Sequence, residues 1–300
     1  MLKIAWSDIY AHSLPANHRF PMEKYTLVPD QLHYEGTISE ANLFVPNRLE
    51  EAQILRTHDS DYWFKLKHQT LNRQEERKTG FPLSVDLVER ERIIMQGTVD
   101  AAKYALIHGI GMNLAGGTHH AFTNRGEGFC LLNDIAIAAN ELLDKHLASK
   151  ILVIDLDVHQ GNGTAEIFSN ELRVFTFSMH GEKNYPLQKE QSDLDVELAD
   201  GSEDKTYLKL LDFHLKSLFQ TVAPDFVFFQ SGVDVLATDK LGRLGLTING
   251  CKRRDEMVLE ICHQNKVPIA ICMGGGYSTD IKHIVEAHAN TYRLAQEIFF

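Results

Sequence analysis

Several features that would place a chain in a specialised class are missing from this sequence of 300 residues. No apolar run approaches the roughly 20 residues needed to cross a bilayer. The first residues lack the apolar core and the cleavage site of a signal peptide. No Pro- or Gly-rich linker, low-complexity block or internal repeat divides the chain, so we expect a single domain over residues 1–300.

Cysteine is also scarce, and its four residues do not form a recognisable framework. They are Cys130, Cys251, Cys262 and Cys272. None belongs to a CxxC pair, and all have apolar neighbours, which argues against disulfides or a zinc knuckle. We expect buried thiols in a reducing compartment, and hence a cytoplasmic protein.

An excess of positive charge is absent as well, because the formal net charge is −11. This balance argues against sequence-independent binding to nucleic acid or to anionic membranes. It is compatible with a cationic ligand such as a lysine-bearing peptide or a polyamine. Acidity that only keeps a protein in solution is the simpler explanation.

What the sequence does contain, from about residue 84 onward, is an alternation of helical patterns with short apolar runs. The predicted helices cover about 84–107, 133–146, 204–219, 251–263 and 280–296, and the apolar runs about 112–115, 151–154, 174–178, 226–230 and 267–272. Such alternation predicts an α/β fold, a three-layer αβα sandwich with a mostly parallel central sheet. In such folds ligands bind beyond the carboxyl ends of the strands.

Four of the predicted strand exits carry glycine together with metal-binding or proton-handling residues. These exits are 116–120, 155–159, 231–234 and 274–277. If the chain stays extended after residue 154, then Asp155, Asp157 and His159 all point the same way. We predict that Asp157, His159 and Asp234 bind a metal, since two carboxylates and one imidazole leave the open position of a catalytic zinc site.

Other polar residues at these exits suit roles around such a metal. Of the tandem pair His119 and His120, one can take a proton from a metal-activated water and deliver it to a leaving amine. Adjacent side chains on an extended segment point apart, so we expect the two histidines to have different partners. Tyr277 is predicted to stabilise a developing oxyanion, and Asp155 to orient a histidine or bind a monovalent cation.

In this order, these motifs resemble those of the zinc-dependent histone deacetylase family, which has the arginase–deacetylase fold. The matching segments are 116–121, 128–134, 155–163, 231–234 and 274–277, and the resemblance extends from about His18 to the C-terminus. The variant His-Gln-Gly-Asn-Gly at 159–163, together with residues 124–130, resembles the class IV branch and its bacterial relatives.

The resemblance implies a hydrolase that removes acyl groups from lysine side chains of proteins or peptides, with Zn²⁺ held by the three residues named above. It assigns His120 to the general base and then acid, His119 to its partner histidine, and Tyr277 to the oxyanion. A K⁺ site is implied at Asp155, Asp157, His159, Ser178 and Met179. The implied substrate tunnel is lined by Gly128, Phe129, Tyr185 and Gly275, with Arg19 at its inner end.

One position departs from the class I pattern. Asn162 stands where class I members carry Asp, so it can orient His120 through a hydrogen bond but supplies no negative charge. We therefore expect a less basic His120 than in class I, because an anionic neighbour favours imidazolium.

Alternatives remain at the level of substrate. A hydrolase of acetylpolyamines or other small acylated amines has the same ligands, and access through residues 48–82 decides between the two. A catalytically silent binding module fits less well, since every ligand and Tyr277 are present. An arginase-type dimanganese enzyme needs further carboxylates at the 116–120 exit. The acyl length, from acetyl to long fatty acyl, and the oligomeric state stay open.

Overall fold

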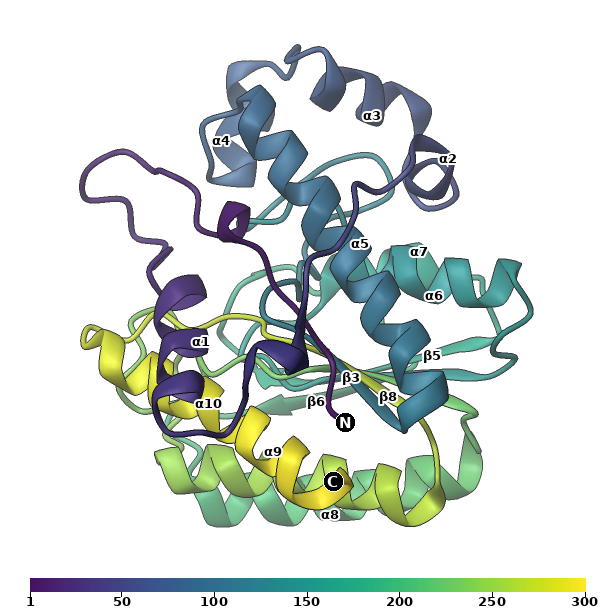
Figure 1. Ribbon diagram of the computed structural model, residues 1–300, viewed down its shortest axis with the longest axis vertical. Coiled ribbons are helices and arrows are strands. Elements are labelled where there is room, and N and C mark those ends of the chain that lie inside the picture. The colour runs from purple at the N-terminus through teal and green to yellow at the C-terminus, as the bar shows by residue number, and fades with distance from the viewer.

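An eight-stranded sheet forms the centre of the computed structural model, which describes residues 1–300 (Figure 1). The strand order is β2-β1-β3-β8-β7-β4-β5-β6, and every neighbouring pair is parallel. The strands are β1 Ile4–Ala5, β2 Leu43–Phe44, β3 Ile110–Asn113, β4 Ile151–Asp155, β5 Val174–Gly181, β6 Leu194–Leu198, β7 Phe226–Gln230 and β8 Ile269–Cys272. The predicted parallel α/β fold is confirmed.

Helices lie on both faces of this sheet. In Figure 1, α5, α6 and α7 lie on one side, α8, α9 and α10 on the other, and α1 packs beside α10. The helices are α1 Lys24–Tyr34, α2 Glu51–Ile54, α3 Ser60–Lys67, α4 Arg73–Thr79, α5 Val85–His108, α6 Asp134–Asp144, α7 Asn162–Phe168, α8 Asp204–Thr221, α9 Ile248–Asn265 and α10 Ile281–Phe299. None of them is both long and apolar enough to cross a membrane.

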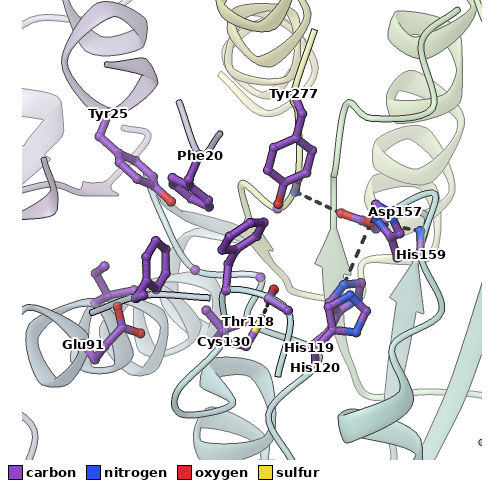
Figure 2. Close-up of a pocket in the computed structure, with 18 of the residues that line it drawn as sticks. Phe20, Tyr25, Glu91, Thr118, His119, His120, Cys130, Asp157, His159 and Tyr277 are labelled. Carbon is purple, nitrogen blue, oxygen red and sulfur yellow. Dashed lines mark hydrogen bonds and ion pairs between the residues drawn. The ribbon is translucent and has the colours of Figure 1, made fainter. Parts of the chain in front are cut away.

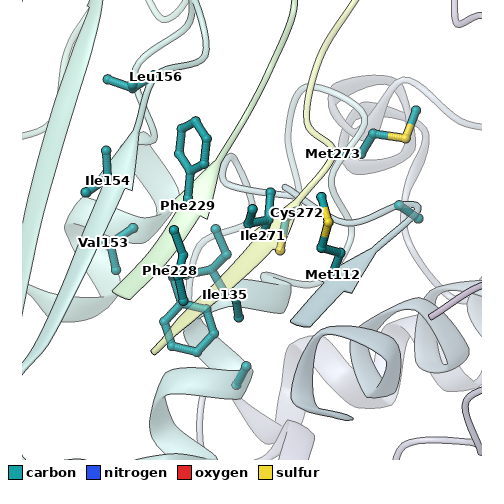
Figure 3. Close-up of a cluster of buried hydrophobic side chains, with 14 of the residues drawn as sticks. Met112, Ile135, Val153, Ile154, Leu156, Phe228, Phe229, Ile271, Cys272 and Met273 are labelled. Atoms are coloured by element: carbon teal, nitrogen blue, oxygen red, sulfur yellow. The ribbon is translucent and has the colours of Figure 1, made fainter. Parts of the chain in front are cut away.

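The core lies where the apolar strands meet these helices. All five residues of β4 and of β7 are buried, because each strand has neighbours on both edges and helices on both faces. Figure 3 shows side chains such as Val153, Phe228 and Ile271 packed in this core. The four cysteines are free and buried, as predicted.

Helix boundaries follow local capping signals. The α5 helix begins after Ser84, whose side chain accepts a hydrogen bond from the Leu87 amide, and ends at Gly109 with φ of +83°. The α6 helix begins after Asn133, which accepts from the Ala136 amide. The predicted run 112–115 is shifted, because the strand starts directly after Gly109.

The first 83 residues add elements that the sequence pattern did not predict. Two of them, β1 and β2, are strands of two residues each, too short to show a period. Later in the chain, the edge strand β6 alternates apolar and acidic residues and is mostly half-exposed, so it lacks the apolar run of a central strand. The short helices α2, α3 and α4 lie together beside the start of α5 (Figure 1).

A buried arginine connects the outer helix layer to the strand exits. Arg254 of α9 donates hydrogen bonds to the carbonyls of Leu156 at 3.1 Å and Gly232 at 2.5 Å, beyond β4 and β7. Its charge is balanced by Asp255, at 2.7 Å, and both side chains are fully buried. Arg254 therefore fixes the two exits relative to each other.

We predict that Arg254→Ala lowers the free energy of unfolding by about 3–5 kcal/mol, because it leaves Asp255 buried without its partner. The adjacent Arg253, about half-exposed and paired with Glu256 and Glu260, is the matched control. Arg253→Ala should change stability by about 0–1 kcal/mol. Urea unfolding of both variants measures the difference, and equal losses would contradict the role given to Arg254.

Candidate metal centre and active site

Three buried side chains converge beyond the centre of the sheet. His159 Nδ1 lies 3.1 Å from Asp157 Oδ1 and 3.1 Å from Asp234 Oδ2. The potential ligand atoms of all three residues lie within 4.8 Å of one another. Asp157 and His159 follow β4, whereas Asp234 follows the neighbouring strand β7.

Turns, and not an extended strand, bring these groups together. The β4 strand ends at Asp155, where the simple alternation expected through His159 stops, so that expectation was wrong. The Asp157 amide donates to Asp155 Oδ1 at 3.2 Å, and the His159 amide donates to Asp157 Oδ1 at 3.0 Å. These side-chain-to-backbone bonds are typical of Asx turns.

Backbone amides hold both carboxylates, and each carboxylate also has one oxygen that faces the His159 ring. The Gly275 amide donates to Asp157 Oδ2 at 2.9 Å, and the Val158 amide donates to Asp234 Oδ1 at 3.0 Å. The second oxygen of each carboxylate is directed toward the imidazole. The oxygens that face His159, Asp157 Oδ1 and Asp234 Oδ2, are the ones directed toward a shared cation, although Asp157 Oδ1 also accepts from the His159 amide.

The electrostatics of the cluster also call for a cation. Burial by itself lowers the pKa of His159, but the adjacent Asp157 and Asp234 carboxylates raise it to about 10. Burial and the Asp157 charge raise the pKa of Asp234 to about 7. Two buried carboxylates and one imidazole are the donor set of a catalytic zinc ion with an open position, so these residues fit Zn²⁺.

Two glycines leave space for the carboxylates. A Cβ atom at Gly275 would lie 2.1 Å from Asp234 Oδ2 and 2.7 Å from Asp157 Oδ2, and one at Gly232 would lie 2.2 Å from Asp157 Oδ2. Both distances at Gly275 are well below van der Waals contact. A side chain at this position must therefore displace the carboxylates of both Asp157 and Asp234.

The two tandem histidines have different partners. His119 Nδ1 lies 2.7 Å from Asp155 Oδ2, and His120 Nδ1 lies 2.6 Å from Asn162 Oδ1. Because both partner atoms are acceptors, each Nδ1 carries the proton, which leaves Nε2 of a neutral ring as a proton acceptor. Their ring centroids are 4.1 Å apart.

The pKa values of the two rings are shifted in opposite directions by their surroundings. Burial opposes the charging of His119, but the carboxylates of Asp155 and Asp157 raise its pKa above the usual value. Burial, together with the neighbouring His119 and His159, holds the pKa of His120 well below its usual range. His120 is thus the neutral member of the pair, beside a carboxamide rather than a carboxylate.

Tyr277 lies across the cavity from the histidine pair, with its hydroxyl directed into the pocket (Figure 2). Burial, reinforced by Asp234 and Asp157, raises the pKa of this phenol well above its usual value, so it stays protonated. The Tyr277 amide donates to Asp239 Oδ2 at 2.6 Å, which positions the backbone of the loop. The protonated phenol can therefore donate a hydrogen bond into the cavity.

Three residues that sequence reasoning missed hold the loops of this site. Lys24 Nζ donates to the Gly274 carbonyl at 2.9 Å, and Asp239 binds the Tyr277 amide. Asp134 accepts from the amides of Gly117 and Thr118, at 3.0 and 2.8 Å, and so fixes the loop before the histidines. Of the three, only Asp134 lies within one of the matching segments, 128–134.

The cation that lines the inner cavity is Arg90 and not Arg19, so the expectation for Arg19 was wrong. Arg19 is exposed and lines the outer pocket, where its guanidinium lies 5.4 Å from the centre of the Phe129 ring. Lys24 is fully buried beside Tyr277. Burial lowers the pKa of Lys24 to about 8, against the opposing effect of Asp234 and Asp157.

The predicted tunnel residues line two spaces that have several lining residues in common. Gly128 and Phe129 line both an outer pocket of about 620 Å³ and an inner cavity of about 40 Å³. Tyr185 lines only the outer pocket, and Gly275 only the inner cavity. The Tyr185 ring stands perpendicular to that of His120, with centroids 4.9 Å apart.

The residues expected at a K⁺ site are partly brought together. Asp155 of β4 and Ser178 of β5 lie opposite each other on these two neighbouring strands. Ser178 Oγ also lies 2.9 Å from His180 Nδ1. Met179, the next residue along β5, pairs with Val196 on the other edge of that strand.

Comparison with known proteins places this site in a family. Residues 18–292 match the histone deacetylase domain. The chain belongs to the histone deacetylase family. It is 42% identical over 296 residues to an uncharacterized protein of Picosynechococcus sp., and the match covers 99% of both chains. It is 32% identical over 299 residues to histone deacetylase clr6 of Schizosaccharomyces pombe, covering 90% of this chain and 70% of clr6.

Solved structures of this family share the fold. An HDAC homolog from Aquifex aeolicus superposes with a TM-score of 0.83 at 24% identity, covering 97% of this chain and 82% of that one. An HDAC homolog complexed with SAHA gives 0.82 at 24% identity, covering 98% and 82%. The eight-stranded parallel sheet with helices on both faces is therefore the histone deacetylase architecture.

We predict that Gly275→Ala weakens zinc binding by at least about tenfold, because its Cβ displaces the carboxylate oxygens. Gly36→Ala is the matched control, since Gly36 has φ of +78° but a Cβ there would meet no other atom within 4 Å. That control should lose about 1 kcal/mol of stability and keep its zinc affinity. Competition with a zinc chelator measures both, and equal affinities would contradict the crowding at Gly275.

Proposed function

We propose that this histone deacetylase family member is a zinc-dependent hydrolase that removes acetyl and other short acyl groups from lysine side chains of proteins or peptides. One observation carries the proposal: the buried Asp157, His159 and Asp234 group lies beside His120 and Tyr277, at the inner end of a pocket open to solvent. The family match agrees with this chemistry.

Different residues of the chain have different roles in amide hydrolysis. When bound, Zn²⁺ would polarise the acyl carbonyl and lower the pKa of a water molecule toward about 7. His120, oriented by Asn162 through Nδ1, accepts the proton of that water at Nε2 and returns it to the leaving amine. The protonated Tyr277 hydroxyl donates to the carbonyl oxygen as it becomes negative.

The size of the inner cavity supports a short acyl group. Its volume of about 40 Å³ has room for a few water molecules, each of which needs roughly 10–15 Å³. Phe20, Phe81 and Ile94 are among the side chains that close it. An acetyl methyl group fits such a space, whereas a long fatty chain requires these side chains to move.

Finer parts of the assignment rest on single contacts. The bond from His120 to Asn162 supports a class IV-like member, since the carboxamide occupies the position at which class I has a carboxylate. The register pair of Asp155 and Ser178 supports a structural K⁺ site with Asp157, His159 and Met179. A core that is continuous from Leu2 to Ala295 supports one catalytic domain over 1–300.

We predict that His159→Ala abolishes both zinc binding and turnover. Tyr277→Phe should keep its zinc, but its kcat should fall by a factor of about 10²–10³. The reason is that His159 belongs to the metal group, while Tyr277 only donates to the developing oxyanion. Metal analysis by mass spectrometry and deacetylation kinetics measure the two effects. His146→Ala, at an exposed histidine, is the control that should retain both. Stoichiometric zinc in His159→Ala would remove the central assignment.

The acyl preference is tested with one lysine peptide acylated with chains from acetyl to myristoyl. We predict that kcat/KM is highest for acetyl and falls with chain length, because the inner cavity is small. An acetylpolyamine assayed alongside distinguishes the small-amine alternative. Faster turnover of myristoyl than acetyl lysine would contradict the size argument, and turnover of the polyamine alone would replace the lysine assignment.

A further inference from the structure

The outer pocket around the tunnel mouth is strongly basic, although the chain as a whole is acidic. The side chains that line it include five basic residues and one acidic residue, Glu127. The basic residues are Arg19, Arg77, Lys78, Lys183 and Arg243. The formal net charge of the chain, by contrast, is −11.

These cations come from four separate parts of the chain. Arg77 and Lys78 end α4, Arg19 belongs to the loop before α1, Lys183 follows β5, and Arg243 precedes α9. In Figure 1 the loop before α1 and the α4 helix lie on the same side of the molecule. Their convergence on one pocket is a property of the fold, which no run of basic residues in the sequence indicates.

Little negative charge is available in the protein to balance them. Arg19, Arg77 and Lys183 form no ion pair and no side-chain hydrogen bond with another residue, and all three are exposed. Arg243 pairs with Asp200 at 3.3 Å, and Lys78 lies 3.9 Å from Glu127. At least three unpaired positive charges therefore face the entrance.

The single acid of the lining is already engaged. Glu127 accepts a hydrogen bond from the Tyr185 hydroxyl at 2.6 Å and another from Arg125 Nε at 2.9 Å. Its side chain is only 14% exposed. It therefore serves to hold the tunnel wall in place and is poorly placed to bind a cationic substrate.

From this charge distribution we propose that the enzyme selects acyl-lysine peptides whose neighbouring residues are acidic. The inference rests on the proposed lysine deacylase function and names its substrate class. The acylated lysine itself is neutral, so charge selection must act through the residues on either side, which remain at the mouth. A mouth lined by one sign of charge concentrates ligands of the opposite sign and speeds their encounter. The same field repels an acetylpolyamine, which carries further positive amines.

The test compares three acetyl-lysine peptides that are identical except for flanking glutamate, glutamine or arginine. We expect kcat/KM to be at least about tenfold higher for the glutamate peptide than for the glutamine peptide, through a lower KM. The preference should shrink between about 0.01 M and about 1 M salt, where the screening length falls from about 30 Å to about 3 Å. An acetylpolyamine should be the poorest substrate.

Variants of the mouth establish where the preference arises. In the double variant Arg77→Glu with Lys183→Glu, the preference for glutamate over arginine flanks should be lost or reversed. The double variant Lys209→Glu with Lys216→Glu is the charge-matched control, since both lysines lie on α8 outside the pocket lining and should leave the preference unchanged. A double variant that keeps the wild-type preference would overturn the assignment to this pocket.

The experiments distinguish a failure of the proposed preference for acidic flanks from a failure of the deacylase function itself. Equal kcat/KM for all three peptides would overturn the inference and leave the deacylase function intact. Binding of the same peptides to the Tyr277→Phe variant, followed by fluorescence anisotropy, measures selection without turnover. Tighter binding of the glutamate peptide there supports the inference even where the chemistry is slow, and equal or weaker binding overturns it.

Discussion

The cost of burying two carboxylates at the end of a parallel sheet governs the rest of this structure. Asp157 and Asp234 lie almost completely out of water, and an isolated buried charge is strongly unfavourable. Backbone amides hold both oxygens of Asp157 and one of Asp234, and one oxygen of each carboxylate is directed toward the His159 ring. Nothing larger than glycine fits at Gly275, so the cluster and its loops have to be built together.

The supporting polar contacts then follow from the same constraint, because each exit loop must hold its position without water. Arg254 holds the carbonyls beyond β4 and β7, and Asp134 holds the amides before the histidine pair. Lys24 and Asp239 hold the loop that carries Tyr277. The residues that orient the reacting groups are therefore themselves fixed by buried charges.

How far the sequence predicts this arrangement depends on whether the signal is local. The strands β4 and β7 and the exits after them were predictable, since a buried central strand is a continuous apolar run and its exit follows directly. Lys24 was not, because its partner, the Gly274 carbonyl, is 250 residues away and α1 has only a weak periodic pattern. Arg19 was expected at the inner end of the tunnel, but it lines the outer pocket, and Arg90 of α5 lines the inner cavity instead.

Substrate recognition is another property that the sequence predicts poorly, because net charge does not show where the charges lie. A value of −11 averages over the whole surface, whereas a substrate meets only the mouth of the tunnel, where positive charges predominate. Screening confines such interactions to about 10 Å at 0.1 M salt, so distant acidic residues contribute little there. Composition alone made a cationic ligand plausible, but the fold assembles basic residues from four segments around the entrance. The charge preference for a substrate therefore depends on where the basic residues lie around the entrance, and the net charge of the chain does not predict it.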